Sequence, residues 1–175
     1  MTNKLKTPLL ASPQALTQQW TELAQDEHSP DYYELTEYGE LVWYAHPGNA
    51  HQRLCAEMAF QLQTQLGGEA VHAVAILTPR AGVRVPDVVW MPQERWEAML
   101  PTQALIDAPN LVVEVLTSND RKSAISHKIH GYLKSGVKEV ILVGLTGTIE
   151  YIHPNGRHAT SLFPLKLDLP AHLFA

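Results

Sequence analysis

The chain has 175 residues, of which 45 % are hydrophobic and 18 % charged, so it is large and apolar enough for one folded domain with a real core. The single cysteine, Cys55, excludes an internal disulfide framework, and no apolar run suits a signal peptide or a membrane span, so we expect a cytoplasmic protein. The formal net charge of −5 counts mildly against binding nucleic acid by phosphate neutralisation alone.

A short amphipathic helix is predicted near the start of the chain. Ser12 is the expected N-cap and Pro13 the first helical residue. Apolar residues then recur at helical spacing, at Leu16, Trp20 and Leu23. We expect residues 1–30 to form a helical extension and residues 31–175 to form a single domain.

The domain is expected to begin with a hairpin whose strands, 31–35 and 40–45, flank a turn at 36–39. A longer helix is predicted from Asn49 to Leu66, because apolar side chains recur on one of its faces and two glycines follow it.

Two strands, 70–77 and 83–91, are predicted next, joined by a turn at 79–82. Pro86 lies inside the second strand, and because proline cannot donate to a sheet ladder it marks an edge, a bulge or a bend. A short helix is predicted over 92–100.

The second half of the domain is predicted to contain strand 110–116, a helix from Asp120 to Ser135, and strand 139–145 with a hairpin partner at 148–153. The strand–helix–strand segment is long enough for a right-handed parallel crossover, whereas the first half looks antiparallel. The sequence therefore predicts an α/β fold of the α+β kind, with helices flanking a mixed sheet. Its core order is helix, strand, strand, strand, helix, strand.

Two acidic residues lie in apolar strands, where burial is expected. Side chains alternate between the two faces of a strand, so Glu114 and Asp87 each share a face with apolar residues two positions away on either side. Burying an isolated carboxylate costs several kcal/mol or more, so each needs a cation or a shifted pKa. The plainer alternatives are an edge-strand or ion-pair role for Glu114 and turn chemistry after Pro86 for Asp87.

Lys128 lies beside the apolar stripe of its predicted helix rather than opposite it, so its side chain could reach the sheet. The plainer alternative is a lysine whose stem covers apolar surface while its ammonium stays in water. In the functional interpretation, Asp87 and Glu114 hold Mg²⁺, with Mn²⁺ as a substitute, and the ion activates water. Lys128 then positions that water or neutralises the phosphate, which completes a minimal site for phosphodiester hydrolysis.

The segments RVPDVVW at 84–90 and APNLVVEVLTSNDRKSAISHKIHGYLKSGVKEVILV at 108–143 resemble the Uma-type family of restriction endonucleases, within the PD-(D/E)XK nuclease superfamily. The upstream YYELTEYGELVW, followed by a histidine at a helix start, matches the opening of the family, so the resemblance covers about residues 31–145. It implies a restriction-endonuclease-like core and a Mg²⁺-dependent endonuclease that acts on DNA. Because two cuts need two sites, it also implies a homodimer.

The resemblance assigns roles to individual residues. Asp87 matches the acid of the Pro-Asp motif, Glu114 matches the second acid, and Lys128 matches a lysine that this family carries on the following helix. Glu40 and His51 match recurring polar positions near the site. Glu40 could equally be a surface acid of the hairpin, and His51 a capping or surface histidine.

The sequence departs from the pattern of the family around these residues. It has Thr-Ser-Asn at 117–119 instead of Ser-Pro-Ser, Ala124 instead of an acid, and Gly144 instead of aspartate. These departures support a second hypothesis, a catalytically inactive nuclease-fold protein that binds nucleic acid or mediates assembly.

A zinc protein is a third class to consider, because the chain has nine histidines. The histidine pair at helical spacing, His127 and His130, is expected to face solvent, and one cysteine gives no cluster. Cys55 shares its helix face with Met58 and Leu62, so it is expected to be a core residue rather than a nucleophile.

Overall fold

The computed structural model describes residues 9–45 and 47–174, so residues 1–8 of the predicted extension and residue 175 lie outside it. The helices are α1 (Pro13–Gln25), α2 (Asn49–Leu66), α3 (Gln93–Glu97), α4 (Lys122–Ser135) and the 3₁₀ helix η1 (Ala171–Leu173). The strands are β1 (Tyr33–Leu35), β2 (Leu41–Trp43), β3 (Glu69–His72), β4 (Ile76–Thr78), β5 (Gly82–Arg84), β6 (Val88–Met91), β7 (Leu111–Val115), β8 (Glu139–Val143), β9 (Ile149–His153) and β10 (Gly156–His158). Within this part of the chain, no helix combines the length and the hydropathy of a transmembrane segment.

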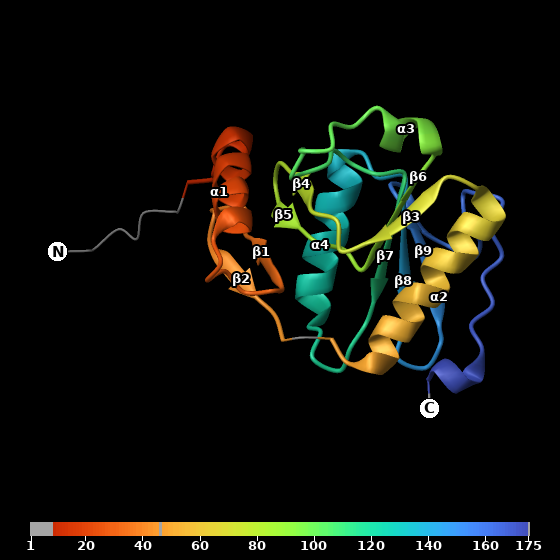
Figure 1. Cartoon of the computed structure of the whole chain (residues 1–175). Coiled ribbons are helices and arrows are strands. Elements are labelled where there is room, and N and C mark those ends of the chain that lie inside the picture. Colours follow the sequence, from red (N-terminus) through yellow and green to blue (C-terminus); the bar gives the residue numbers. More distant parts are fainter. Residues whose placement is uncertain (1–8, 46, 175) are drawn as a thin grey trace.

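Two sheets organise the chain (Figure 1). The larger has six strands in the order β10-β9-β8-β7-β6-β3, and the smaller has four in the order β2-β1-β5-β4. Strands β7 and β8 pair in parallel across the crossover helix α4, while β6 and β9 pair antiparallel on either side of them. The mixed sheet with flanking helices that the sequence predicts is confirmed.

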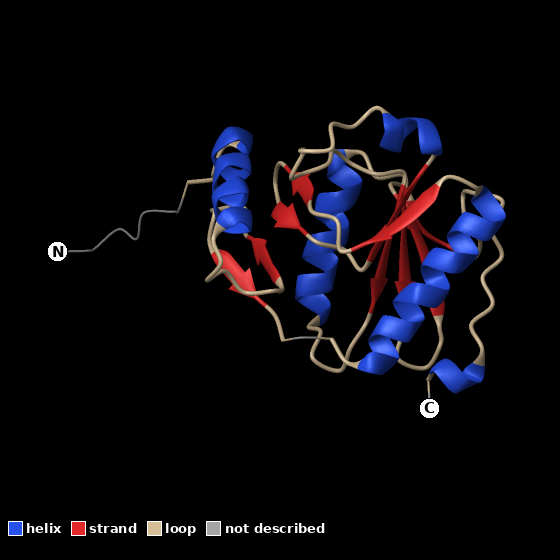
Figure 2. Cartoon of the chain, in the orientation of Figure 1, coloured by secondary structure: helices blue, strands red, loops and turns tan. Residues whose placement is uncertain are grey.

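Helices α2 and α4 cover opposite faces of the six-stranded sheet (Figure 2). On one face, Met58 and Leu62 of α2 pack against alternate residues of β7, including Val113. On the other face, Ile129 and Tyr132 of α4 pack against the residues between them. All five residues of β7 are buried, which explains its nearly continuous apolar sequence.

Both strands that the sequence predicts at 70–77 and 83–91 are each two strands in the structure, and this part of the prediction is wrong. The first is divided near Ala73, the one non-glycine residue with positive φ (51°) among the described residues, and the second at the buried Pro86. At each break the chain passes between the two sheets, because β3 and β6 belong to the larger sheet and β4 and β5 to the smaller. Asp87 therefore lies immediately before β6 rather than within a strand.

The predicted helix boundaries are close to those observed. Helix α2 spans Asn49–Leu66, as predicted. Helix α4 begins at Lys122 rather than at Asp120, because the Asp120 carboxylate accepts hydrogen bonds from the backbone N–H and the hydroxyl of Thr117 (2.6 and 2.8 Å). These bonds hold Asp120 in a turn that precedes the helix.

Helix α1 packs against the smaller sheet. Ser12 caps it by accepting a hydrogen bond from the Ala15 N–H (3.1 Å), as its position predicts. Leu16 and Trp20 then join an apolar cluster with residues of β1 and β5, and the Trp20 ring lies 4.6 Å from that of Tyr33. The smaller sheet and α1 thus share one core.

A buried acid that the sequence analysis did not single out anchors the C-terminal segment. Glu139 is fully buried at the start of β8, and its carboxylate is 2.7 Å from His153 Nε2. It also accepts hydrogen bonds from the Ser161 hydroxyl (2.7 Å) and the Leu162 N–H (2.6 Å). This anchor lies at the end of the sheet opposite Glu114, because Glu139 pairs with Leu111 and Glu114 pairs with Leu142.

The close approach of β5 to β1 gives a first prediction, on Gly82. This residue has φ +87°, and a Cβ added to it would overlap the backbone carbonyl of Leu35. We expect Gly82→Ala to lower the free energy of unfolding by about 3 kcal/mol or more, because backbone strain adds to the overlap. Gly136→Ala is the matched control: Gly136 also has positive φ, but its added Cβ meets only an ordinary contact, so we expect a loss of about 1 kcal/mol. Equal losses in urea unfolding would contradict the proposed overlap.

Candidate active site

The register of β6 on β7 brings two of the predicted site residues together. Val88 pairs with Val113 in this antiparallel ladder, so the next opposed positions are Asp87 and Glu114. The Asp87 carboxylate accepts a hydrogen bond from the Val115 N–H at 2.7 Å. The two acids thus meet at the carboxyl end of β7, where the ladder with β6 ends.

Lys128 reaches the same place from α4. Its ammonium lies 2.8 Å from Glu34 Oε1, 3.9 Å from Glu114 Oε1 and 5.3 Å from the centre of the Tyr44 ring. Burial alone would lower the pKa of Lys128, but the carboxylates of Glu114 and Glu34 outweigh it and raise that pKa above its ordinary value. Lys128 is therefore a fixed positive charge rather than a proton acceptor.

Glu34, which the sequence analysis missed, is the second partner of Lys128. The residue is 1 % exposed, and four donors surround its carboxylate: the Lys128 ammonium, the Arg84 guanidinium (2.9 Å), the Tyr44 hydroxyl (2.9 Å) and the Val85 N–H (3.0 Å). Burial raises the pKa of Glu34, but the positive charges of Lys128 and Arg84 lower it by more, so the net pKa is below the ordinary value. The signal in the sequence was weaker than that of Glu114: Tyr33 and Leu35 adjoin Glu34, but the polar Thr36 lies two positions after it.

Glu114 is the least compensated acid of the group. It is 6 % exposed, and its Oε1 accepts a hydrogen bond from the Tyr132 hydroxyl at 2.6 Å. The pKa of Glu114 is raised to about 7: burial raises it most, Lys128 lowers it, and the nearby carboxylates of Asp87 and Glu34 raise it. When Glu114 is ionised and His51 is neutral, the cluster holds three carboxylates, Glu34, Asp87 and Glu114, and two cations, Lys128 and Arg84, so it favours an additional cation.

The two candidate accessory residues have different surroundings. His51, in the first turn of α2, has Nε2 3.3 Å from Asp87 Oδ1 and 3.1 Å from the Val115 carbonyl oxygen. Its hydrogen bond with Asp87 raises the pKa of His51 despite the opposing effect of burial. Glu40 is exposed at the end of the hairpin turn, where its N–H donates to the Thr36 hydroxyl. The position of Glu40 fits the surface-acid alternative, and Glu34 is the hairpin acid that reaches the cluster.

The fold defines the class of protein to which the chain is similar. It matches the crystal structure of a nuclease described as "putative" and "belonging to DUF820", from Anabaena variabilis ATCC 29413, with a TM-score of 0.68. The match covers 89 % of this chain and 96 % of that chain at 16 % sequence identity, so the likeness is one of fold. The chain has a nuclease-like fold.

A family model narrows this class. Residues 17–165 match the model of the Uma2 family, whose description is "Putative restriction endonuclease". The chain therefore belongs to the Uma2 family, as its motifs predict. A comparison with curated proteins found no match.

The burial of Glu114 gives a prediction on the pH dependence of stability. The pKa of Glu114 is about 7 in the folded protein, against an ordinary value of 4.5, so the folded state binds more protons between these values. The contribution of Glu114 to stability therefore falls as the pH rises through this window. Because an amide still accepts the Tyr132 hydrogen bond, we expect Glu114→Gln to be more stable than the wild type by about 1–3 kcal/mol at pH 8.

This gain should shrink toward pH 5, where Glu114 in the wild type takes up a proton and becomes neutral like glutamine. The measurement is the free energy of unfolding of both proteins across this pH range. Glu40→Gln, which changes an exposed acid, is the control and should show no such trend. A variant that is less stable than the wild type at pH 8 would contradict the explanation.

Proposed function

We propose that the protein is a Mg²⁺-dependent endonuclease that hydrolyses phosphodiester bonds of DNA. The observation that carries the proposal is the meeting of Asp87, Glu114 and Lys128 at the end of β7, from three separate elements of the fold. Family membership and the nuclease-like fold support the same reaction class.

The chemistry of the site fits a magnesium ion. Mg²⁺ prefers oxygen ligands and is commonly bound by one or two carboxylates together with water and substrate phosphates. Asp87 and Glu114 would hold it, and the excess of carboxylates in the cluster favours its binding. When bound, the ion supplies positive charge for the phosphate oxygens and for the attacking water. Mn²⁺ shares the preference for oxygen and is the expected substitute.

The side chains around the acids hold them in place. The contacts of Glu114 with Tyr132 and Lys128 both involve Oε1, so Oε2 would be the oxygen that Glu114 offers to an ion. His51 positions Asp87 through the contact with Oδ1, while Oδ2 accepts from β7. Lys128 keeps its charge beside the phosphate, where it stabilises the negative charge of the transition state and orients water.

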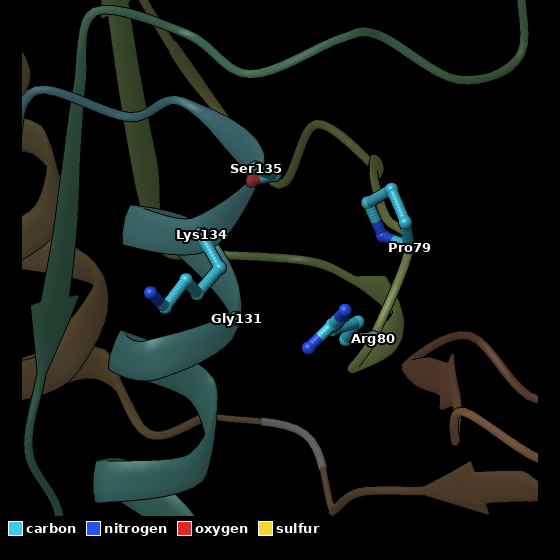
Figure 3. A pocket seen from close by; sticks show the side chains of 5 residues that line it. All are labelled: Pro79, Arg80, Gly131, Lys134 and Ser135. Atoms are coloured by element: carbon cyan, nitrogen blue, oxygen red, sulfur yellow. The ribbon is translucent and has the colours of Figure 1, made fainter.

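A basic pocket beside α4, the helix that carries Lys128, supports DNA as the substrate. Arg80, on the turn between β4 and β5, extends toward α4 (Figure 3). The pocket is lined by Pro79, Arg80, Gly131, Lys134 and Ser135. Arg80 and Lys134 are exposed cations, which suit contacts with the phosphate backbone beyond the scissile bond.

The proposal predicts the effect of removing each member of the trio. We expect Asp87→Asn, Glu114→Gln and Lys128→Met each to slow Mg²⁺-dependent plasmid nicking about 100-fold or more, because each removes an ion ligand or a transition-state charge. Asp107→Asn, at an exposed acid, is the matched control and should nick like the wild type. Measured rates should be zero in EDTA and recover with Mg²⁺ or Mn²⁺.

Two results would decide against this reaction. Equal nicking by the wild type and Glu114→Gln would mean that a contaminating nuclease cuts the plasmid. No nicking by the wild type, together with retained DNA binding, would favour the alternative of a catalytically inactive nuclease-fold protein, which the departures at 117–119, Ala124 and Gly144 motivate.

We further propose that the enzyme acts as a homodimer, since cutting both strands needs two sites. Strand β2 lies at an edge of the smaller sheet, and its Leu41 and Trp43 are 39 % and 69 % exposed. An edge strand with exposed apolar side chains is suited to pairing with another chain. Light scattering should give twice the monomer mass for the wild type and a lower mass for Trp43→Lys; a monomeric wild type would remove this part of the proposal.

A further inference from the structure

A second group of metal-ligand side chains adjoins the proposed magnesium site. One ligand atom each of His51, Cys55 and Asp87 lie within 4.8 Å of one another. His51 and Cys55 are four residues apart on α2 and therefore share one face of the helix. Asp87 approaches them from the segment before β6. The sequence analysis missed this group because it treated Cys55 as a core residue without a polar partner.

The His51 ring lies between the thiol and the carboxylate. Its Nδ1 is 3.5 Å from Cys55 Sγ, and its Nε2 is 3.3 Å from Asp87 Oδ1. Tetrahedral zinc, with Zn–N and Zn–S bonds of about 2.0 and 2.3 Å, places such ligand atoms about 3.5 Å apart. The His51 Nδ1–Cys55 Sγ pair already has this spacing. A single ion binds one ring nitrogen, so the His51 ring and the Asp87 carboxylate, which now faces Nε2, would have to shift relative to one another before Asp87 joins as the third ligand. One ligand atom of each of the three residues lies within 4.8 Å of the others, which keeps that shift short.

The donor set distinguishes this group from the magnesium site. Nitrogen, sulfur and oxygen together suit Zn²⁺, whereas Mg²⁺ requires oxygen and keeps much of its water. Only Asp87 belongs to both sets. An ion held by His51 and Cys55 would therefore draw on the same carboxylate that the proposed nuclease reaction needs.

We propose that His51, Cys55 and Asp87 form a zinc site, and that Zn²⁺ bound there inhibits the enzyme by withdrawing Asp87 from Glu114. The inhibitory part rests on the proposed function, while the zinc site itself does not. On binding, the Cys55 S–H bond breaks, its proton goes to solvent, and the thiolate coordinates the ion; a water completes the tetrahedron. In the metal-free protein the buried Cys55 (3 % exposed) stays an unreactive thiol.

Cobalt provides a direct readout, because Co²⁺ replaces Zn²⁺ in such sites and a thiolate ligand gives it a charge-transfer band in the near ultraviolet. Cys55 is the single cysteine of the chain, so any such band reports this residue. We expect the band in the wild type, its loss on addition of Zn²⁺ and its absence in Cys55→Ala. We expect His51→Ala and Asp87→Asn each to weaken Co²⁺ binding about tenfold or more.

The controls separate this site from surface histidines. His130→Ala alters an exposed pair with His127 and should leave the band unchanged. Thermal unfolding of each variant checks that it is folded. Absence of the band in the folded wild type would overturn the zinc site, and so would a band that neither His51→Ala nor Asp87→Asn weakens.

The inhibition is tested separately by adding Zn²⁺ to nicking reactions at fixed Mg²⁺. Each variant is compared with its own rate without Zn²⁺. We expect Zn²⁺ to slow the wild type about tenfold or more and Cys55→Ala much less. Equal slowing would overturn the inhibition but not the site. A wild type without Mg²⁺-dependent nicking would overturn the proposed function, and the cobalt result would then decide the zinc site alone.

Discussion

The structure depends on one buried ammonium held between two carboxylates. Lys128 of α4 lies against Glu34 of the smaller sheet and Glu114 of the larger sheet, so one contact group joins both sheets and the helix that follows β7. None of these charges would be stable if buried alone, and removal of Lys128 would leave both carboxylates without it, whereas Lys128 keeps Glu34 when the Glu114 charge is removed. Arg84 and Tyr132 complete the group by bonding the two glutamates from either side. The contacts that join the two sheets here are therefore the same contacts that form the site.

The site is balanced toward binding a cation rather than toward stability. Tyr132 and Lys128 compensate only part of the burial of Glu114, and the carboxylate of Asp87 works against them. The fold tolerates this because the surrounding core is well packed: Val112, Val113 and Tyr132 are all fully buried. Buried charges that lower stability but favour binding of an ion are common at functional sites, where residues are suited to chemistry rather than to stability.

Simple strand and helix periodicity was sufficient to find much of this site. An acid between apolar neighbours singled out Glu114, and a lysine beside an apolar stripe singled out Lys128. Glu34 has apolar neighbours next to it in the chain, but Thr36 lies two positions after it, so the same-face criterion used for Glu114 does not select it. What periodicity could not supply was the choice of sheet. Pro86 marked a possible bend in 83–91, but nothing local to 70–77 or 83–91 indicates that the chain changes sheets there, because that depends on which partner strands are free to pair. The spacing of His51 and Cys55 was visible as well, but the approach of Asp87 to them is a tertiary fact.

The break at Pro86 has a consequence for how the molecule could be dissected. Immediately before this proline, Val85 bonds Glu34 beside the smaller sheet; immediately after it, Asp87 bonds Val115 in the larger. Residues 85–87 therefore connect the Glu34 and Asp87 parts of the cluster through one short segment, which the proline ring makes rigid. A fragment limited to the six-stranded sheet and its helices would keep Asp87 and Glu114 but lose Glu34, the carboxylate that holds the Lys128 ammonium in place. The active site and the contact between the two sheets would therefore have to be kept or redesigned together.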